Sequence, residues 1–196
     1  MVSNLKFIAP TWDEIYAKSV SLAAKLRREE RMPFNCLVGV SRGGLVLARI
    51  LSDLLDIQDV HIIKCEYYSD MGETNRKPRI TQKIQGNITG KDVLIVDDVA
   101  DTGESLIEIK KYLESRKPKE MKVATLYIKP WSKVLPDFYT SKTKAWIIFP
   151  WELYESMKLL STRKIKTSLD ETHIPPKYAK MLHKMDIKLG HFGKND

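Results

Sequence analysis

Two adjacent carboxylates, followed by a turn with a glycine and two hydroxyls, are the strongest chemical signal in the sequence. The apolar run Val93-Leu-Ile-Val96 leads into Asp97 and Asp98, and Asp101-Thr102-Gly103-Glu104-Ser105 comes two residues later. The glycine permits close backbone approach, and the N–H groups of a helix starting here favour an anion such as phosphate. Unpaired carboxylates at the end of a buried strand are costly to desolvate, so a metal ion or sugar hydroxyls are natural partners.

A purely local interpretation covers part of this segment. Asp101 as a helix N-cap, with Glu104 three residues later, is a capping arrangement that needs no ligand. It leaves the Asp97–Asp98 pair unexplained. A second polar turn, Ser41-Arg42-Gly43-Gly44, also follows an apolar run, and it places a cation beside two glycines.

The elements around these turns alternate between strand and helix. Short apolar runs predict strands at 35–40, 60–67, 91–96, 121–128 and 144–149. Helical spacing predicts helices at 11–31, at 45–55 and from Ser105 to about Ser115. A Thr11–Glu14 capping box opens the first of them. This alternation indicates an α/β fold with a parallel sheet, which binds ligands at the carboxyl ends of its strands. Residues 68–90 are polar and rich in turn formers, so we expect a long loop there, of which 68–83 would close over the site.

The composition of the chain restricts the classes of protein to which it can belong. The chain has 196 residues and a net charge of +8, with 43% hydrophobic residues and 30% charged ones, which is typical of a globular protein. No apolar run approaches the ~20 residues of a membrane span, and no signal peptide is recognisable, so we expect a cytoplasmic protein with no membrane partner. Residues 156–196 hold nine Lys/Arg against four Asp/Glu, a local surplus of +5. We expect two helical segments in this region, around 152–163 and 176–186.

The two turns resemble motifs of one family. The segment from Val93 to Ser105 resembles the phosphoribosyl-pyrophosphate (PRPP) motif of the type I phosphoribosyltransferases, and Ser41-Arg42-Gly43-Gly44 is similar to the pyrophosphate loop of their 6-oxopurine members. Ile128-Lys129-Pro130 and the stretch 146–152 resemble the purine-recognition segments of the xanthine–guanine branch. The motifs occur in family order. The resemblance implies a type I phosphoribosyltransferase fold: a mainly parallel twisted sheet flanked by helices, with a base-binding hood.

The resemblance also implies a role for each matching residue. Turn 101–105 would cradle the 5′-phosphate, Asp101 would act as the catalytic acid/base at purine N7, and Asp98 would be nearest to Mg²⁺, the implied cofactor. Lys129 would donate to O6, Trp146 would stack on the base, and Ile147 would contact its N1/C2 edge. The implied PRPP-binding residues are Arg42, Gly43, Asp97, Asp98, Asp101, Thr102, Gly103, Glu104 and Ser105, and the implied base-binding residues are Asp101, Lys129, Trp146 and Ile147.

The implied activity is purine salvage. The phosphoribosyl group of PRPP would pass to hypoxanthine or guanine, with xanthine as a further candidate, giving the nucleoside 5′-monophosphate and pyrophosphate. Adenine on the same scaffold is the first alternative. A PRPP-sensing regulator that binds nucleic acid on its positive surface is the second, although the sequence contains no helix-turn-helix or aromatic RNA-binding signature. The family commonly forms dimers or tetramers, so we expect a homodimer or homotetramer.

The remaining predictions concern regions outside the motifs. We expect a core at 1–152, including a base-recognition segment at 129–152, and a helical extension at 153–196. Glu104 stands where the family often has a small residue, so its side chain must point away from the phosphate. Any of Arg76, Lys77 and Arg79 is a candidate for reaching the pyrophosphate. Cys36 and Cys65 match no disulfide framework or zinc motif, and the four histidines, His61, His173, His183 and His191, lack metal-ligand spacing.

Overall fold

The computed structural model describes residues 6–29, 34–68, 77–162, 177–178 and 181. The chain divides into two compact units, each described here by itself. The larger unit is Ile15–Thr143, and the smaller one joins Met1–Glu14 to Lys144–Asp196.

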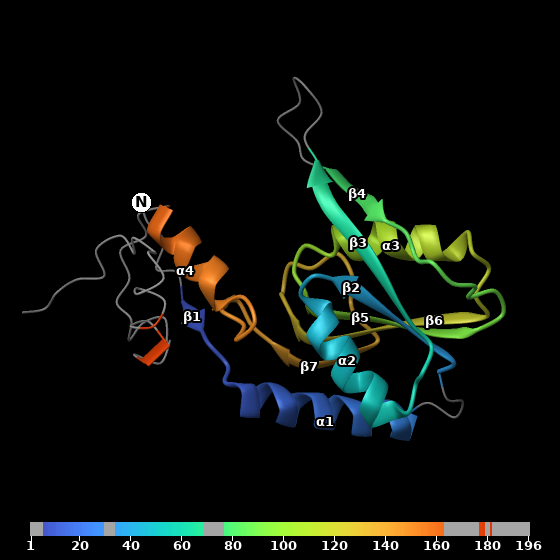
Figure 1. Cartoon of the computed structure of the whole chain (residues 1–196), viewed down its shortest axis with the longest axis horizontal. Helices are drawn as coiled ribbons and strands as arrows, with labels where there is room; N and C mark the ends of the chain where they lie inside the picture. Colours follow the sequence, from blue (N-terminus) through green and yellow to red (C-terminus); the bar gives the residue numbers. More distant parts are fainter. Residues whose placement is uncertain (1–5, 30–33, 69–76, 163–176, 179–180, 182–196) are drawn as a thin grey trace, which may run out of the picture. The chain divides into compact units, whose positions relative to one another are not determined.

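A six-stranded sheet forms the centre of the larger unit (Figure 1). Its strand order is β4-β3-β2-β5-β6-β7, and every neighbouring pair is parallel except β3 and β4. The predicted α/β fold with a mainly parallel sheet is therefore confirmed. The strands are β2 (Cys36–Ser41), β3 (Val60–Tyr68), β4 (Lys77–Gln82), β5 (Asp92–Ala100), β6 (Glu120–Ile128) and β7 (Phe138–Lys142).

Helices cover both faces of this sheet (Figure 1). On one face, α3 (Glu104–Glu114) buries its apolar residues among those of β2, β3, β5 and β6, including Val93 and Ile95. Alternate residues of β5 point to the other face, where α2 (Gly44–Leu55) contacts β2 and β5. The central strands β2 and β5 are covered on both sides, which explains why they read as continuous apolar runs.

The first helix, α1 (Trp12–Glu29), begins as the sequence predicts. The backbone N–H of Thr11 donates to Oε2 of Glu14 at 2.7 Å, and the backbone N–H of Glu14 donates to Oγ1 of Thr11 at 3.2 Å. This is the reciprocal pair of a capping box, which satisfies two N–H groups that the helix leaves open.

Some elements differ from the prediction. The segment 68–90 contains strand β4, which pairs antiparallel with β3 at the edge of the sheet. Strand β5 runs on through the acidic pair to Ala100, and β7 was not predicted. The expected strand at 144–149 is reduced to β8 (Trp146–Ile147).

In the smaller unit, β8 pairs in parallel with β1 (Phe7–Ile8), so Phe7 lies opposite Trp146. The helix α4 (Leu153–Thr162) follows an aromatic group in which the rings of Phe149 and Trp151 are stacked 4.7 Å apart. α4 agrees with the first helical segment expected after residue 152, and most of the second lies outside the described residues. Within the described part of the chain, no helix has the length and apolar character that crossing a membrane requires.

Candidate functional site

The two motif turns meet at the carboxyl ends of β2 and β5. A Cβ atom on Gly44 would lie 2.5 Å from the carbonyl oxygen of Val96 and 2.8 Å from Cα of Asp97. A Cβ atom on Gly43 would lie 2.0 Å from Oδ2 of Asp98. Position 44 therefore requires glycine, because a side chain would meet backbone of the acidic strand end, and a side chain at position 43 would displace the Asp98 carboxylate.

The acidic pair is held in a partly desolvated position. Asp98 is only 7% exposed, and its backbone N–H donates to Oδ1 of Asp97 at 3.0 Å. Burial and then the negative charge of Asp98 raise the pKa of Asp97 well above its usual value, although backbone hydrogen bonds from Asp98 and Gly44 oppose this. A cation or a set of hydroxyl donors here would stabilise the ionised pair. Carboxylate oxygens are also the ligands that Mg²⁺ prefers, so the donor set fits this ion.

Beside the pair lies a cavity of about 230 Å³. The turn residues Asp101, Thr102, Gly103 and Ser105 line it, with Asp97 and with Tyr67 from β3. Gly103 has φ +80°, a left-handed conformation suited to glycine, and it immediately precedes α3. The first N–H groups of α3 therefore begin at this cavity, where they can bind an anion.

Asp101 does not cap α3; the backbone N–H of Glu104 instead donates to Oγ1 of Thr102 at 3.4 Å. The residue at the N-cap of α3 is Gly103, and it forms no side-chain capping bond. The local interpretation of Asp101 as an N-cap is therefore wrong. Glu104 instead accepts a hydrogen bond from Nζ of Lys133 at 2.7 Å, and it is not among the residues that line the cavity. The expectation that its carboxylate points away from the phosphate position agrees with this contact.

The segment after β6 runs along the turn and fixes it. The backbone N–H of Lys129 donates to the carbonyl of Ala100, and that of Lys133 donates to the carbonyl of Thr102, both at 2.9 Å. A Cβ atom on Gly103 would lie 2.7 Å from the backbone nitrogen of Val134. The turn is thus enclosed between the sheet and a second stretch of backbone.

Within this segment, Trp131 holds the predicted acid/base. Its indole Nε1–H donates to Oδ1 of Asp101 at 2.8 Å. Nζ of Lys129 lies 5.7 Å from the centre of the Trp131 ring, and Lys129 is 7% exposed. Burial lowers the pKa of the Lys129 ammonium, and the nearby Asp101 carboxylate offsets part of that shift. Asp101 and Lys129 thus both lie close to the side chain of Trp131. The sequence motifs did not indicate Trp131, although it stands two residues after Lys129.

A second overlooked contact joins β3 to the turn. The Tyr67 hydroxyl lies 3.0 Å from Oγ1 of Thr102, at hydrogen-bond distance. Tyr67 is close to the end of β3, where the expected closing loop begins. Lys77 and Arg79 lie on β4, whereas Arg76 falls outside the described residues.

The other predicted residues are placed as follows. Arg42 is exposed between β2 and α2, and the peptide bond that joins it to Ser41 is cis. Trp146 and Ile147 belong to the smaller unit, where Trp146 is 40% exposed and Ile147 is buried. A tryptophan in an apolar strand is usually buried in the core. Trp146 is not, so its ring is exposed to solvent.

Fold and site together define a mainly parallel α/β protein with an acidic pair, two close glycines and a helix-opening turn at the carboxyl ends of β2 and β5. The phosphoribosyl transferase domain matches residues 11–156 of the sequence, and the chain belongs to this family. The predicted family and fold are therefore confirmed.

Several similar proteins are named as phosphoribosyltransferases of purine bases. A xanthine-guanine phosphoribosyltransferase of Cereibacter sphaeroides is 33% identical over 149 residues, which are 73% of this chain and 85% of that protein. A purine phosphoribosyltransferase from Pyrococcus horikoshii has a crystal structure with 38% sequence identity and a TM-score of 0.67, covering 75% of this chain and 94% of that one. A xanthine-guanine-hypoxanthine phosphoribosyltransferase from Helicobacter pylori has 25% identity and a TM-score of 0.64, covering 79% of this chain and 97% of that one.

The close packing of Gly44 can be tested by Gly44→Ala. The added Cβ would meet backbone atoms of Val96 and Asp97, so the acidic pair must move. Overpacking of this kind costs about 1–3 kcal/mol, and we expect PRPP to bind at least about tenfold more weakly by calorimetry. Gly90→Ala is the control, because Gly90 has φ +70° and open space around it, so that variant loses stability without contact at the site. Equal PRPP affinity in Gly44→Ala and wild type would contradict the role of this contact.

Proposed function

We propose that this protein transfers the phosphoribosyl group of PRPP to a 6-oxopurine base, releasing pyrophosphate and a purine nucleoside 5′-monophosphate. The observation that carries the proposal is the packing of Gly43 and Gly44 against Asp97 and Asp98, beside a cavity with an anion-binding turn. This arrangement suits a ligand with hydroxyls next to a phosphate ester. The named purine phosphoribosyltransferases among the relatives support the same substrate class.

In the reaction, a purine ring nitrogen attacks the anomeric carbon of PRPP. The bond from that carbon to the pyrophosphate oxygen breaks, the leaving group takes the electron pair, and the purine gives up a proton. The transition state resembles an oxocarbenium ion, so the protein acts mainly by positioning and by screening charge. Turn 101–105 would hold the 5′-phosphate through its N–H groups and the hydroxyls of Thr102 and Ser105, and the acids Asp97 and Asp98 would accept the ribose hydroxyls.

Asp101 is the proposed acid/base toward the purine proton. The Trp131 N–H bonds to one of its oxygens, which orients the carboxylate and leaves the other oxygen for the base. Lys129 is the proposed donor to the purine O6, and its burial would strengthen that hydrogen bond. Trp146 and Ile147 are proposed to complete base recognition, by stacking and through backbone contacts.

Asp98 is the proposed Mg²⁺ ligand, since it offers a carboxylate beside a second acid. Mg²⁺ bound with the pyrophosphate of PRPP would neutralise charge on the leaving group. Arg42 and Gly43 are proposed to contact that group, with Lys77 or Arg79 of β4 joining them when the segment 68–83, which includes β4, closes over the site. Closure would exclude water, which otherwise hydrolyses PRPP. We further propose that the protein works in the cytoplasm as a homodimer or homotetramer.

A panel of bases tests the proposed activity. Protein, Mg²⁺ and PRPP are mixed separately with hypoxanthine, guanine, xanthine and adenine, and nucleotides are separated by chromatography. We expect nucleotide from hypoxanthine or guanine at least about tenfold faster than from adenine, because an unpaired donor at Lys129 costs about 1–3 kcal/mol. Nucleotide from adenine alone would favour the adenine enzyme. Salt-dependent binding of nucleic acid without turnover of any base would favour the regulator.

Asp101→Asn tests the acid/base. The amide keeps the size of the side chain but cannot take up the purine proton, so we expect kcat to fall by about tenfold or more. Circular dichroism and the melting temperature are measured beside the kinetics to confirm folding. Wild-type turnover in the folded variant would remove Asp101 from the chemistry.

Trp131→Phe tests the orientation of Asp101. The phenyl ring retains most of the packing but loses the N–H that bonds to Asp101 at 2.8 Å. Since Trp131 is 52% exposed, we expect a loss in kcat of only about three- to tenfold, with KM for PRPP nearly unchanged. Trp12→Phe makes the same exchange in the smaller unit as a control. An equal drop in both variants, or a change confined to KM for PRPP, would contradict the assigned role.

A further inference from the structure

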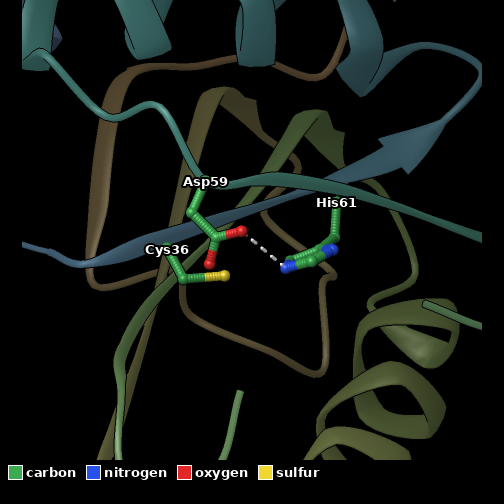
Figure 2. Close-up of side chains that lie close together, drawn as sticks. All are labelled: Cys36, Asp59 and His61. Atoms are coloured by element: carbon green, nitrogen blue, oxygen red, sulfur yellow. Dashed lines mark ion pairs between the residues drawn. The ribbon is translucent and has the colours of Figure 1, made fainter. Parts of the chain in front are cut away.

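Three potential metal ligands converge at the end of the sheet opposite the candidate site. Cys36 is the first residue of β2, Asp59 directly precedes β3, and His61 is the second residue of β3. Their donor atoms all lie within 4.8 Å of one another. Figure 2 shows the Asp59 carboxylate between the Cys36 thiol and the His61 ring. Because β2 and β3 are parallel, this cluster sits at their amino ends, whereas the PRPP motifs sit at carboxyl ends.

The geometry around His61 favours a ligand. Its Nε2 forms an ion-pair contact of 3.0 Å with Oδ1 of Asp59 (Figure 2), yet this buried nitrogen makes no hydrogen bond within the part of the chain that the structure describes. The ring is closely packed, since a Cβ atom on Gly86 would lie 1.9 Å from its Cε1. Buried polar atoms without a hydrogen bond are rare and call for an explanation, and a bound ion supplies one. A lone pair on a fixed, buried imidazole beside a carboxylate is a suitable metal donor.

The donor types select the ion. Thiolate, imidazole and carboxylate together are the ligands of Zn²⁺, which binds them at about 2.0–2.3 Å in a tetrahedron with edges of about 3.2–3.8 Å. The outer limit of 4.8 Å in the cluster thus requires a small contraction of side chains, while the backbone positions remain. Oxygen-preferring ions such as Mg²⁺ do not favour a thiol.

The Lys91 ammonium would compete with a metal ion for the Asp59 carboxylate. Its Nζ lies 2.7 Å from Oδ2 of Asp59, and its side chain is 36% exposed. The ammonium and a metal ion would compete for the same carboxylate charge. Because the Lys91 side chain is partly exposed, it can turn into solvent when an ion binds.

We propose that Cys36, Asp59 and His61 form a binding site for a zinc-class divalent cation that joins the beginnings of β2 and β3. On binding, the Cys36 thiol loses its proton to solvent and the sulfur donates an electron pair to the ion, with no change in oxidation state. The site lies away from the proposed chemistry, and water would complete the tetrahedron around the three protein ligands. It does not depend on the proposed phosphoribosyl transfer.

Co²⁺ is the probe, because a cobalt–thiolate bond gives a charge-transfer absorption band that reports sulfur ligation directly. The full-length protein is treated with a chelator, dialysed and titrated with Co²⁺ without PRPP. We expect saturation at one equivalent, loss of the band in Cys36→Ser, and at least about tenfold weaker binding in His61→Gln. Cys65→Ser is the matched control, since Cys65 is the only other cysteine and lies outside the cluster, so its band should persist.

Lys91→Met gives a prediction of opposite sign. Removing the competing ammonium frees the Asp59 carboxylate, so Co²⁺ should bind several-fold more tightly than to the wild type. If Cys36→Ser fails to fold, His61→Gln serves instead: Zn²⁺ should raise the melting temperature of the wild type and leave that of His61→Gln nearly unchanged. No band in the wild type, a band that survives Cys36→Ser, or an equal rise in melting temperature in the wild type and in His61→Gln would overturn the proposal.

Discussion

The contact between two glycines and two aspartates is the constraint on which the site depends. Gly43 and Gly44 approach the end of β5 so closely that no side chain fits between them and the acidic pair. This contact brings the turn that follows β2 against Asp97 and Asp98. Burial and the neighbouring Asp98 charge raise the pKa of Asp97, and a ligand with hydroxyls or a cation would stabilise its ionised form.

A second layer of backbone gives the neighbouring turn its shape. The segment that follows β6 bonds to Ala100 and Thr102 and supplies Trp131 to Asp101. Catalysis by positioning needs groups whose orientation is set before the substrate arrives. Here the phosphate turn, the proposed acid/base and the proposed O6 donor are all fixed by the same short stretch of chain. A substitution that moves one of these three groups should therefore also shift the positions of the other two.

The sequence predicts most of the sheet and both motif turns, because buried strands and glycine turns have strong local patterns. Strand β4 (Lys77–Gln82) was not predicted, because it is an exposed edge strand whose sequence shows little alternation of apolar and polar residues. Asp101 looks like an N-cap in the sequence, but its carboxylate is bonded to Trp131, thirty residues away. Cys36, Asp59 and His61 likewise have no motif spacing, and only the pairing of β2 with β3 brings them together. Contacts of this kind are set by tertiary structure and leave no local pattern.

The central claim is that the acidic pair and the adjoining turn bind an activated sugar phosphate. Titration calorimetry of PRPP with Mg²⁺, on the wild type and on Asp98→Asn, tests it most directly. The account predicts one PRPP per chain in the wild type, competition by ribose 5-phosphate, and binding at least about tenfold weaker in the variant. Absence of binding heat in the wild type at several temperatures, or an unchanged affinity in folded Asp98→Asn, would contradict it.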